Sequence, residues 1–119
     1  MSEKKTVLLV DDEADIRELY KLVLESAGFT VIAESNAADA LKRLTAHAVD
    51  LVITDYQMPE MRGDQLIGVI REQYPGLPTI LASGLTHVDV LAKTCRADGH
   101  YHKGTSTMQL VDMVQVALT

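Results

Sequence analysis

Short apolar runs that alternate with longer amphipathic segments set the strongest constraint on how this chain can fold. Each run has the length of a buried strand, and the segment after it repeats its apolar residues at the spacing of one helical face. The runs occupy residues 6–10, 30–33, 51–54, 78–82 and 99–102. Because right-handed helical crossovers between parallel strands produce this alternation, we expect a parallel sheet with helices on both of its faces.

Boundary signals place the predicted helices between these runs. The first helix, near residues 13–27, carries one apolar stripe that includes Leu19, and Gly28 follows where a left-handed cap is favoured. Asn36 is expected to cap the second helix through its side-chain oxygen. The other helices are expected to begin near Gly63, near Val88, and at a cap formed by Thr105 or Ser106.

Composition narrows the class of protein. A chain of 119 residues forms one domain, and its formal charge of -6 argues against nucleic acid or an anionic membrane as a direct partner. The single cysteine, Cys95, excludes an internal disulfide and fits a reducing compartment. The chain shows neither a signal peptide nor an apolar stretch of about 18 residues that could span a membrane, so we expect a cytoplasmic protein.

Reactive side chains follow four of the five predicted strands. Asp11 and Asp12 follow the first, Asp55 the third, Ser83 the fourth and Lys103 the fifth. The carboxyl ends of parallel strands meet at one edge, where open α/β sheets bind their ligands. Strand order cannot be obtained from spacing alone, but the order 2-1-3-4-5 would bring the three carboxylates to one crevice. We therefore expect Asp55 to lie within roughly 6 Å of the Asp11-Asp12 pair.

Each of these residues also has an ordinary structural interpretation. Asp55 could form a turn before Pro59, the acidic pair could cap a helix, and Lys103 could be an exposed lysine. Three crowded carboxylates would repel one another, however, and a hard divalent cation such as Mg²⁺ relieves that repulsion better than these interpretations do. An aspartate on a rigid strand end is suited to act as a nucleophile, and a lysine at the same edge can contact a phosphoryl oxygen.

Four motifs occur in order at these strand ends. They are Val10-Asp11-Asp12-Glu13, the stretch from Asp55 to Gly63 that begins Asp-Tyr-Gln-Met-Pro, Ala82-Ser83-Gly84, and Lys103. Together they resemble the response regulator receiver domain of bacterial two-component signalling, over essentially the whole chain. The resemblance implies a flavodoxin-like three-layer (βα)5 sandwich that forms a single receiver domain over residues 1–119.

The resemblance also implies roles for the site residues. Asp55 would accept a phosphoryl group from a histidine kinase or a phosphotransfer protein, in a Mg²⁺-dependent reaction that leaves an aspartyl phosphate. Asp12, Asp55 and the backbone carbonyl of Gln57 would bind Mg²⁺ directly, Asp11 would help through water, and Ser83 and Lys103 would contact the phosphoryl group. Gln57 and Leu85 would flank the phosphate and set its lifetime.

A switched surface is the expected output. Phosphorylation would bias the surface made by the fourth helix, the last strand and the last helix, which would bind a downstream effector outside this chain or form a weak homodimer. The domain would assist only its own phosphorylation and dephosphorylation and would not otherwise be an enzyme. Met1-Ser2-Glu3 favours a natural start, and the chain ends after the last helix without an output domain, as a stand-alone receiver or a fragment.

Two positions depart from the family pattern. Gly104 stands where a proline normally follows the lysine, so we expect an unusual backbone dihedral in that loop. His100 stands where the family has its switching aromatic residue, and Tyr101 comes one position later on the opposite face of the strand. His100 and His102 share a face, but without a third ligand they are better interpreted as exposed strand residues than as a metal site.

Two other functions are alternatives to a phosphorylation switch. A constitutive interaction module with a vestigial site is one, and the departures at His100 and Gly104 leave room for it. A metal-dependent phosphohydrolase with an aspartyl nucleophile is the other, but such enzymes have Asp-x-Asp after the first strand, whereas position 13 is Glu. They also need substrate-binding insertions that a chain of 119 residues lacks.

Overall fold

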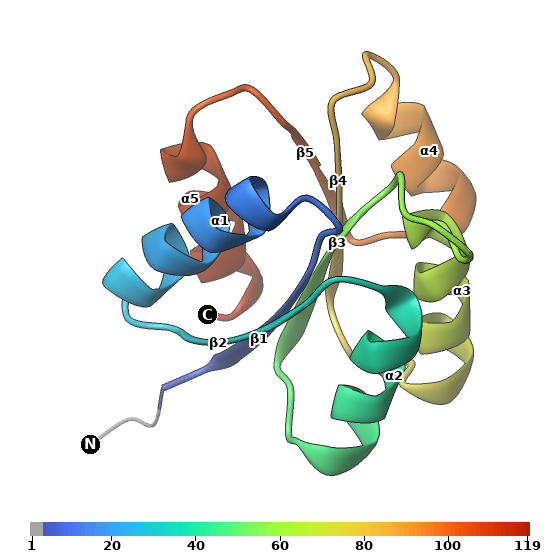
Figure 1. Cartoon of the computed structure of the whole chain (residues 1–119), viewed down its shortest axis with the longest axis horizontal. Coiled ribbons are helices and arrows are strands. Elements are labelled where there is room, and N and C mark those ends of the chain that lie inside the picture. Colours follow the sequence, from blue (N-terminus) through green and yellow to red (C-terminus); the bar gives the residue numbers. More distant parts are fainter. Residues whose placement is uncertain (1–3) are drawn as a thin grey trace.

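A five-stranded parallel sheet forms the middle layer of the molecule, in the order β2-β1-β3-β4-β5 (Figure 1). The computed structural model describes residues 4–119, so the expectation for Met1-Ser2-Glu3 lies outside the described residues. The predicted strand order is confirmed. The strands are β1 (Thr6–Val10), β2 (Thr30–Glu34), β3 (Leu51–Asp55), β4 (Thr79–Ser83) and β5 (Gly99–His102).

Helices cover both faces of this sheet, which gives the predicted three-layer sandwich. The view in Figure 1 places α1 and α5 on one side, and α2, α3 and α4 on the other. The helices are α1 (Ala14–Ser26), α2 (Ala37–Ala46), α3 (Gly63–Gln73), α4 (Val88–Cys95) and α5 (Thr107–Ala117). None of the helices in the described part of the chain has the length and apolarity needed to cross a membrane.

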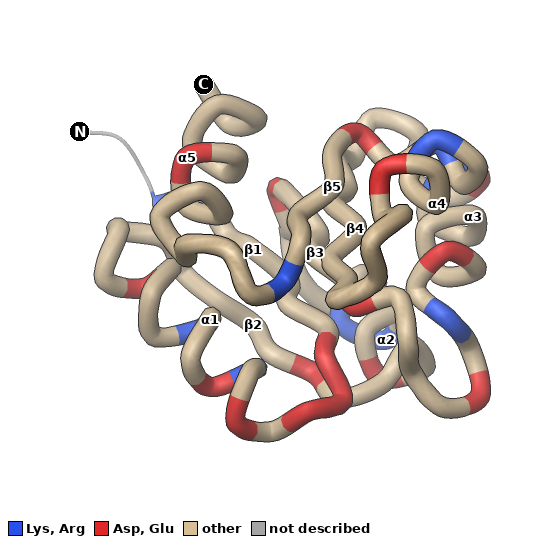
Figure 2. The backbone as a smooth tube through the Cα atoms, turned by 90° about the horizontal axis from the view of Figure 1, so that it is seen from above, with Lys and Arg blue, Asp and Glu red and all other residues tan. Residues whose placement is uncertain are grey.

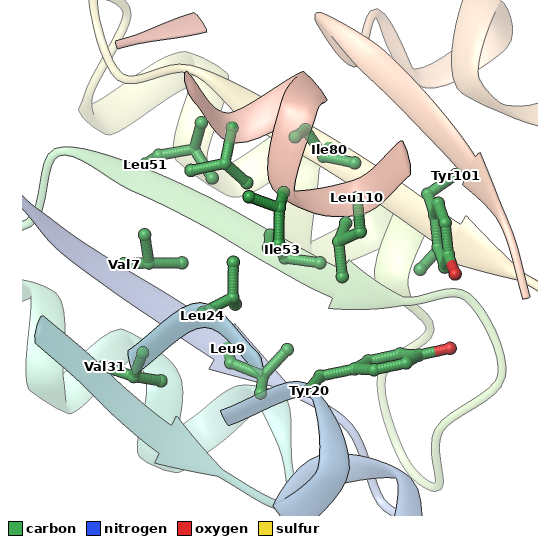
Figure 3. Packing of buried hydrophobic residues seen from close by; sticks show 13 residues of the cluster. Val7, Leu9, Tyr20, Leu24, Val31, Leu51, Ile53, Ile80, Tyr101 and Leu110 are labelled. Carbon is green, nitrogen blue, oxygen red and sulfur yellow. The ribbon is translucent and has the colours of Figure 1, made fainter. Parts of the chain in front are cut away.

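Alternate residues of the central strands supply two separate cores. Val7 and Leu9 of β1 pack with the residues of α1 and α5, as Figure 3 shows, whereas Leu8 and Val10 pack with those of α2 and α3. The central strand β3 is buried at every position from Leu51 to Asp55. This two-sided burial explains why the strands appear in the sequence as continuous apolar runs instead of alternating ones.

Most of the predicted helix boundaries are confirmed, and one prediction about a helix face is wrong. Gly28 has φ +101°, Asn36 accepts a hydrogen bond from the Asp39 amide at 2.8 Å, and Ser106 caps α5 by accepting one from the Met108 amide at 3.2 Å. Leu19 does not belong to the buried stripe of α1, because its side chain is 45% exposed. The stripe that faces the sheet is narrower and centres on Tyr20 and Leu24.

Aspartates also fasten the amino edge of the sheet. Asp50 accepts a hydrogen bond from the Thr6 amide at 2.7 Å, and Asp98 accepts one from the Thr79 amide at 2.8 Å. Arg71 of α3 lies 2.7 Å from the Asp98 carboxylate. Burial alone would raise the pKa of Asp98, but the hydrogen bonds and the charge of Arg71 outweigh burial and lower this pKa. These carboxylates therefore stabilise the first residues of two strands.

Candidate functional site

Four carboxylates gather at the carboxyl edge of the sheet. The chain leaves β1 through Asp11, Asp12 and Glu13, and β3 ends at Asp55, so the parallel pairing of β1 with β3 brings the two segments together. One carboxylate oxygen from each of the four residues lies within 4.8 Å of the others. Figure 2 shows the acidic stretch where β1 passes into α1. The predicted crowding of the acidic pair against Asp55 is confirmed.

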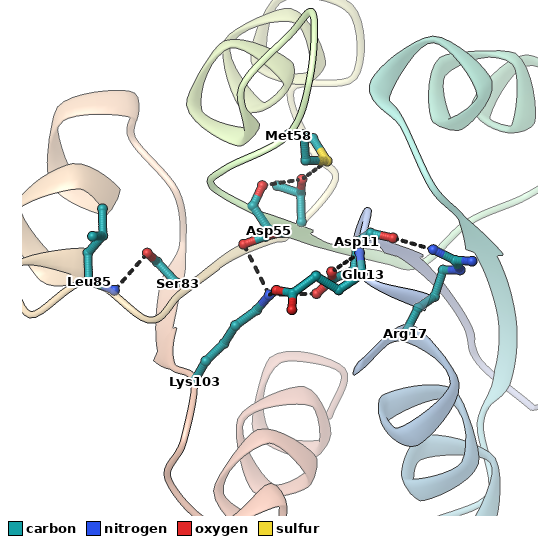
Figure 4. Close-up of polar contacts among 9 residues, drawn as sticks. Asp11, Glu13, Arg17, Asp55, Met58, Ser83, Leu85 and Lys103 are labelled. Atoms are coloured by element: carbon teal, nitrogen blue, oxygen red, sulfur yellow. Dashed lines mark hydrogen bonds and ion pairs between the residues drawn. The ribbon is translucent and has the colours of Figure 1, made fainter. Parts of the chain in front are cut away.

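Lys103, which directly follows β5, reaches across the sheet edge into this cluster (Figure 4). Its ammonium group donates a hydrogen bond to Asp11 at 2.7 Å and lies 3.2 Å from Asp55 and 3.7 Å from Glu13. The side chain of Lys103 is only 12% exposed. The lysine is therefore a nearly buried cation that several carboxylates share.

One lysine does not neutralise the cluster. Burial, together with the charges of Asp11 and Asp12, raises the pKa of Asp55 from 3.8 to about 6, although Lys103 opposes this rise. Burial by itself would lower the pKa of Lys103, but its contacts with Asp11 and Asp55 outweigh burial and raise it. The cluster thus keeps an excess of negative charge, which a further cation would relieve.

Local contacts hold the acidic loop in place. The Asp11 carboxylate accepts a hydrogen bond from the Glu13 amide at 2.9 Å, and Arg17 of α1 donates one to the Asp11 carbonyl at 2.7 Å. Because the Glu13 amide and Lys103 already bind the Asp11 carboxylate, this carboxylate is less available to a metal ion than that of Asp12. Asp12 is exposed, and in the described part of the chain its side chain makes no hydrogen bond or ion pair.

Asp55 is held through its own backbone. The hydroxyl of Thr54 donates to the Asp55 carbonyl at 3.0 Å, and the amide of Gly63, the first residue of α3, donates to the Tyr56 carbonyl at 2.8 Å. A Cβ atom at position 63 would overlap the Asp55 carbonyl oxygen, so only glycine allows α3 to begin this close to the strand end. The Asp55 side chain, 6% exposed, therefore projects from a backbone that these contacts fix.

Gln57 and Ser83, the remaining predicted residues, lie at the same edge of the sheet, and Gln57 lines a cavity there. Gln57 lines it together with Asp12, Asp55 and Lys103. Ser83 ends the neighbouring strand β4 and is 1% exposed, and its hydroxyl oxygen accepts a hydrogen bond from the Leu85 amide at 3.0 Å (Figure 4). The Ser83 hydroxyl proton therefore remains available to another acceptor.

Sequence reasoning missed two contributors to the site. Glu13 was predicted only as part of a motif, yet its carboxylate joins the acidic cluster and lies near Lys103. Arg17 was not predicted at all. Its position one turn into α1, on the side of the acidic loop, is the only signal in the sequence that could have indicated this contact.

The two departures from the family pattern have clear structural forms. Gly104 has φ +95°, which confirms the expected unusual dihedral, and no peptide bond among residues 4–119 is cis. Tyr101 is buried and His100 is exposed, so they lie on opposite faces of β5 as predicted. His102, on the same face as His100, is half-buried. Among the described residues, neither histidine belongs to a cluster that could hold a metal ion.

A doubly wound α/β domain with an acidic cluster and a lysine at its topological switch point is typical of a phosphoryl-accepting signalling domain. The chain matches the response regulator receiver domain family over residues 7–115, and it belongs to that family.

Among its relatives, the C4-dicarboxylate transport transcriptional regulatory protein DctD of Rhizobium meliloti is 40% identical over 102 residues. That alignment covers 85% of this chain but 22% of DctD, so the chain spans about a fifth of that relative's length. An uncharacterized 14.6 kDa protein of Leptolyngbya boryana is 33% identical over 113 residues, which cover 92% of this chain and 86% of that protein.

Solved receiver structures superpose closely on this chain. The chemotaxis response regulator CheY4 of Vibrio cholerae gives a TM-score of 0.88 at 27% identity, covering 98% of this chain and 100% of CheY4. The response regulator TrrA of Thermotoga maritima, crystallised in complex with Mg(2+)-BeF, gives a TM-score of 0.88 at 33% identity, covering 96% and 99% of the two chains.

Family membership defines the biological context. The chain is a regulatory domain of two-component phosphorelay signalling. In such systems a histidine kinase acts before the receiver, and an effector acts after it. Receiver domains in general depend on Mg²⁺, and the donor set found here is suited to it, because Mg²⁺ prefers carboxylate oxygens and retains several waters.

Proposed function

We propose that Asp55 is the phosphoacceptor, and that residues 1–119 form a single receiver domain that takes its phosphoryl group from a histidine kinase or a phosphotransfer protein. The observation that carries this proposal is the placement of Asp55. Its carboxylate is almost fully buried at the end of β3, 3.2 Å from the Lys103 ammonium and beside three other carboxylates. A purely structural aspartate gains nothing from this surrounding negative charge.

The transfer is an in-line displacement at phosphorus. A carboxylate oxygen of Asp55 forms a bond to phosphorus while the bond from phosphorus to the donor's imidazole nitrogen breaks, and that nitrogen keeps the electron pair. Lys103, close enough to contact an oxygen of the incoming phosphoryl group, stabilises the charge on that group during transfer. Later attack by water on the aspartyl phosphate releases inorganic phosphate and restores Asp55, with Gln57 and Leu85 flanking the group.

The acidic cluster divides into direct and indirect ligands of Mg²⁺. Asp12 and Asp55, with the backbone carbonyl of Gln57, would hold the ion directly, and Asp11 would act through a water molecule. This division is supported by the free carboxylate of Asp12 within the described structure and by the two hydrogen bonds that already occupy Asp11. When bound there, Mg²⁺ would neutralise part of the charge that develops on the phosphoryl oxygens.

Ser83 links the phosphoryl group to the output surface. Its side chain would swing inward, so that its hydroxyl donates to a phosphoryl oxygen. Because the hydroxyl oxygen of Ser83 now accepts a hydrogen bond from the Leu85 amide, this swing would displace the segment that leads into α4. The surface of α4, β5 and α5 would then bind a downstream effector, or a second copy of the chain weakly. DctD is a transcriptional regulatory protein, which makes a transcriptional effector one candidate partner.

Intact mass spectrometry after incubation with Mg²⁺ and acetyl phosphate tests the proposal. Wild type should gain the mass of one phosphoryl group, and Asp55→Asn should gain none. Asp112→Asn, which changes an exposed carboxylate on α5, is the matched control and should be labelled like wild type. Absence of an adduct on folded wild type with both acetyl phosphate and phosphoramidate, or equal labelling of Asp55→Asn, would contradict the proposal.

A further inference from the structure

Lys103 lies in a turn whose conformation favours glycine. The Thr105 amide donates a hydrogen bond to the His102 carbonyl at 3.3 Å, which closes a four-residue turn, and Gly104 at its third position has φ +95°. Turns with a positive φ at this position favour glycine, and proline, whose φ is held near about −65°, cannot adopt it. The turn therefore lacks the rigidity that a proline would provide, and other contacts must restrain it.

Tyr101 supplies such a contact from inside the core. Its hydroxyl donates a hydrogen bond to the Thr105 carbonyl at 2.8 Å and lies 3.3 Å from the Ser106 carbonyl. The Tyr101 ring is 2% exposed and meets the Tyr20 ring edge-on, with centroids 5.9 Å apart and an interplanar angle of 84°. Figure 3 shows both rings at the end of the core toward which the strands point. Because the ring is held by its packing, the hydroxyl is held in place against the turn.

These contacts restrain the Lys103 backbone from both sides. Its amide donates to the Ser83 carbonyl at 2.9 Å, which extends the pairing of β5 with β4 by one residue. On the other side, the Tyr101 hydroxyl holds the carbonyl of Thr105, two residues later. Because a lysine side chain has many rotamers, its ammonium stays near Asp55 only if the backbone that carries it is fixed.

We propose that Tyr101 is a positioning residue for Lys103. Its hydroxyl holds the turn from His102 to Thr105, so that the Lys103 ammonium remains in contact with Asp11 and Asp55, and it provides the restraint that a proline at position 104 would otherwise give. This inference rests on the proposed function, because it assigns Tyr101 an effect on the same phosphoryl transfer.

Replacing Tyr101 with phenylalanine removes the hydroxyl and keeps the ring in its packing. Tyr101→Phe should be labelled by acetyl phosphate about tenfold more slowly than wild type, as expected if one hydrogen bond that positions the lysine is lost. Its affinity for Mg²⁺, measured by thermal-shift titration, should stay close to that of wild type, because the carboxylates are untouched. Tyr74→Phe, which removes a hydroxyl at the end of α3, is the matched control and should be labelled at the wild-type rate.

A double-mutant cycle separates positioning from a general structural effect. In a Lys103→Met background, Tyr101→Phe should cause no further loss of labelling rate, because the group that it positions is gone. Backbone ¹⁵N relaxation should also show increased motion of the Gly104 and Thr105 amides in Tyr101→Phe.

The outcomes of this cycle distinguish the two proposals. An unlabelled wild type would overturn the proposed function. A labelled wild type with an unchanged rate in Tyr101→Phe, or with the same fold-loss in both backgrounds, would overturn only the role of Tyr101.

Discussion

Aspartates lie at both edges of the sheet, and the two edges affect them in opposite ways. At the amino edge, Asp50 and Asp98 each accept a backbone hydrogen bond, and the pKa of Asp98 is lowered because Arg71 and the Thr79 amide outweigh its burial. At the carboxyl edge, three of the four clustered carboxylates share Lys103, and burial and repulsion raise the pKa of Asp55 to about 6. The amino edge therefore uses carboxylates for stability, whereas the carboxyl edge holds them close together with an excess of negative charge that a cation can relieve.

Removal of Lys103 should have the largest effect of the changes at either edge, and it should act on the rate of phosphoryl transfer. Lys103→Met should slow acetyl phosphate labelling by about 10²- to 10³-fold, the usual loss when one group that stabilises transition-state charge is removed. The rate is measured by intact mass over time. Lys42→Met, at an exposed position on α2, is the control and should match wild type. A wild-type rate in Lys103→Met would show that the lysine only balances charge.

Mg²⁺ should stabilise the molecule through the carboxyl edge alone. At a Mg²⁺ concentration about 100 times its dissociation constant, the free energy of unfolding should rise by about 2.7 kcal/mol. Urea titrations at pH 7 with and without the ion measure this change. Asp12→Asn should lose most of this stabilisation by Mg²⁺, and Asp98→Ala should keep it. Equal stabilisation of both variants would show that Mg²⁺ does not act through the carboxyl edge alone.

At the amino edge, loss of the Asp98 carboxylate should destabilise the fold whether or not Mg²⁺ is present. Asp98→Ala leaves the buried Thr79 amide without its acceptor and should cost about 1–3 kcal/mol at pH 7, measured by urea unfolding. Because the folded pKa of Asp98 is lowered, its contribution is present above its ordinary pKa. The difference from wild type should therefore shrink as the pH falls through the lowered pKa. Asp89→Asn, at an exposed site on α4, is the control.

Loss of the Asp55 charge should have the smallest effect. It should raise the free energy of unfolding, whereas Asp98→Ala lowers it. Because the folded pKa of about 6 lies above the ordinary 3.8, the folded state binds more protons in this window, and its stability falls as the pH rises through it. Asp55→Asn should remove this slope and raise the free energy of unfolding by about 1–2 kcal/mol at pH 7 without Mg²⁺. A destabilised Asp55→Asn would show that Lys103 already neutralises the acceptor.

The carboxyl edge could be predicted from the sequence, whereas the roles of Asp50 and Asp98 at the amino edge were not predicted. The strands that end in Asp11, Asp55 and Ser83 are continuous apolar runs, and their parallel order determines that these residues meet at one edge. Residues such as Gly28 and Asn36 act on their immediate neighbours, so their effects on helix ends could also be predicted.

The missed features depend on three-dimensional geometry that no local pattern encodes. The contact of Lys103 with Asp11 joins residues that are far apart in the chain, and it depends on how one flexible side chain crosses the strand ends. The approach of Arg17 to a backbone carbonyl depends on the angle at which α1 leaves the sheet. The exposure of Leu19 depends on the width of the contact between α1 and the strands, which helical periodicity alone does not define.

The contact between Gly63 and the Asp55 carbonyl fixes where the segment from residue 56 to residue 62 begins and ends. The hydrogen bond from Gly63 to Tyr56 closes this segment into a loop at its base, directly against the peptide that carries the acceptor. A change that opens this base, such as a larger residue at position 63, would therefore move the acceptor itself. Protein engineers who graft recognition segments onto this scaffold should therefore leave this loop unchanged and use a connection whose ends do not touch the reactive residue.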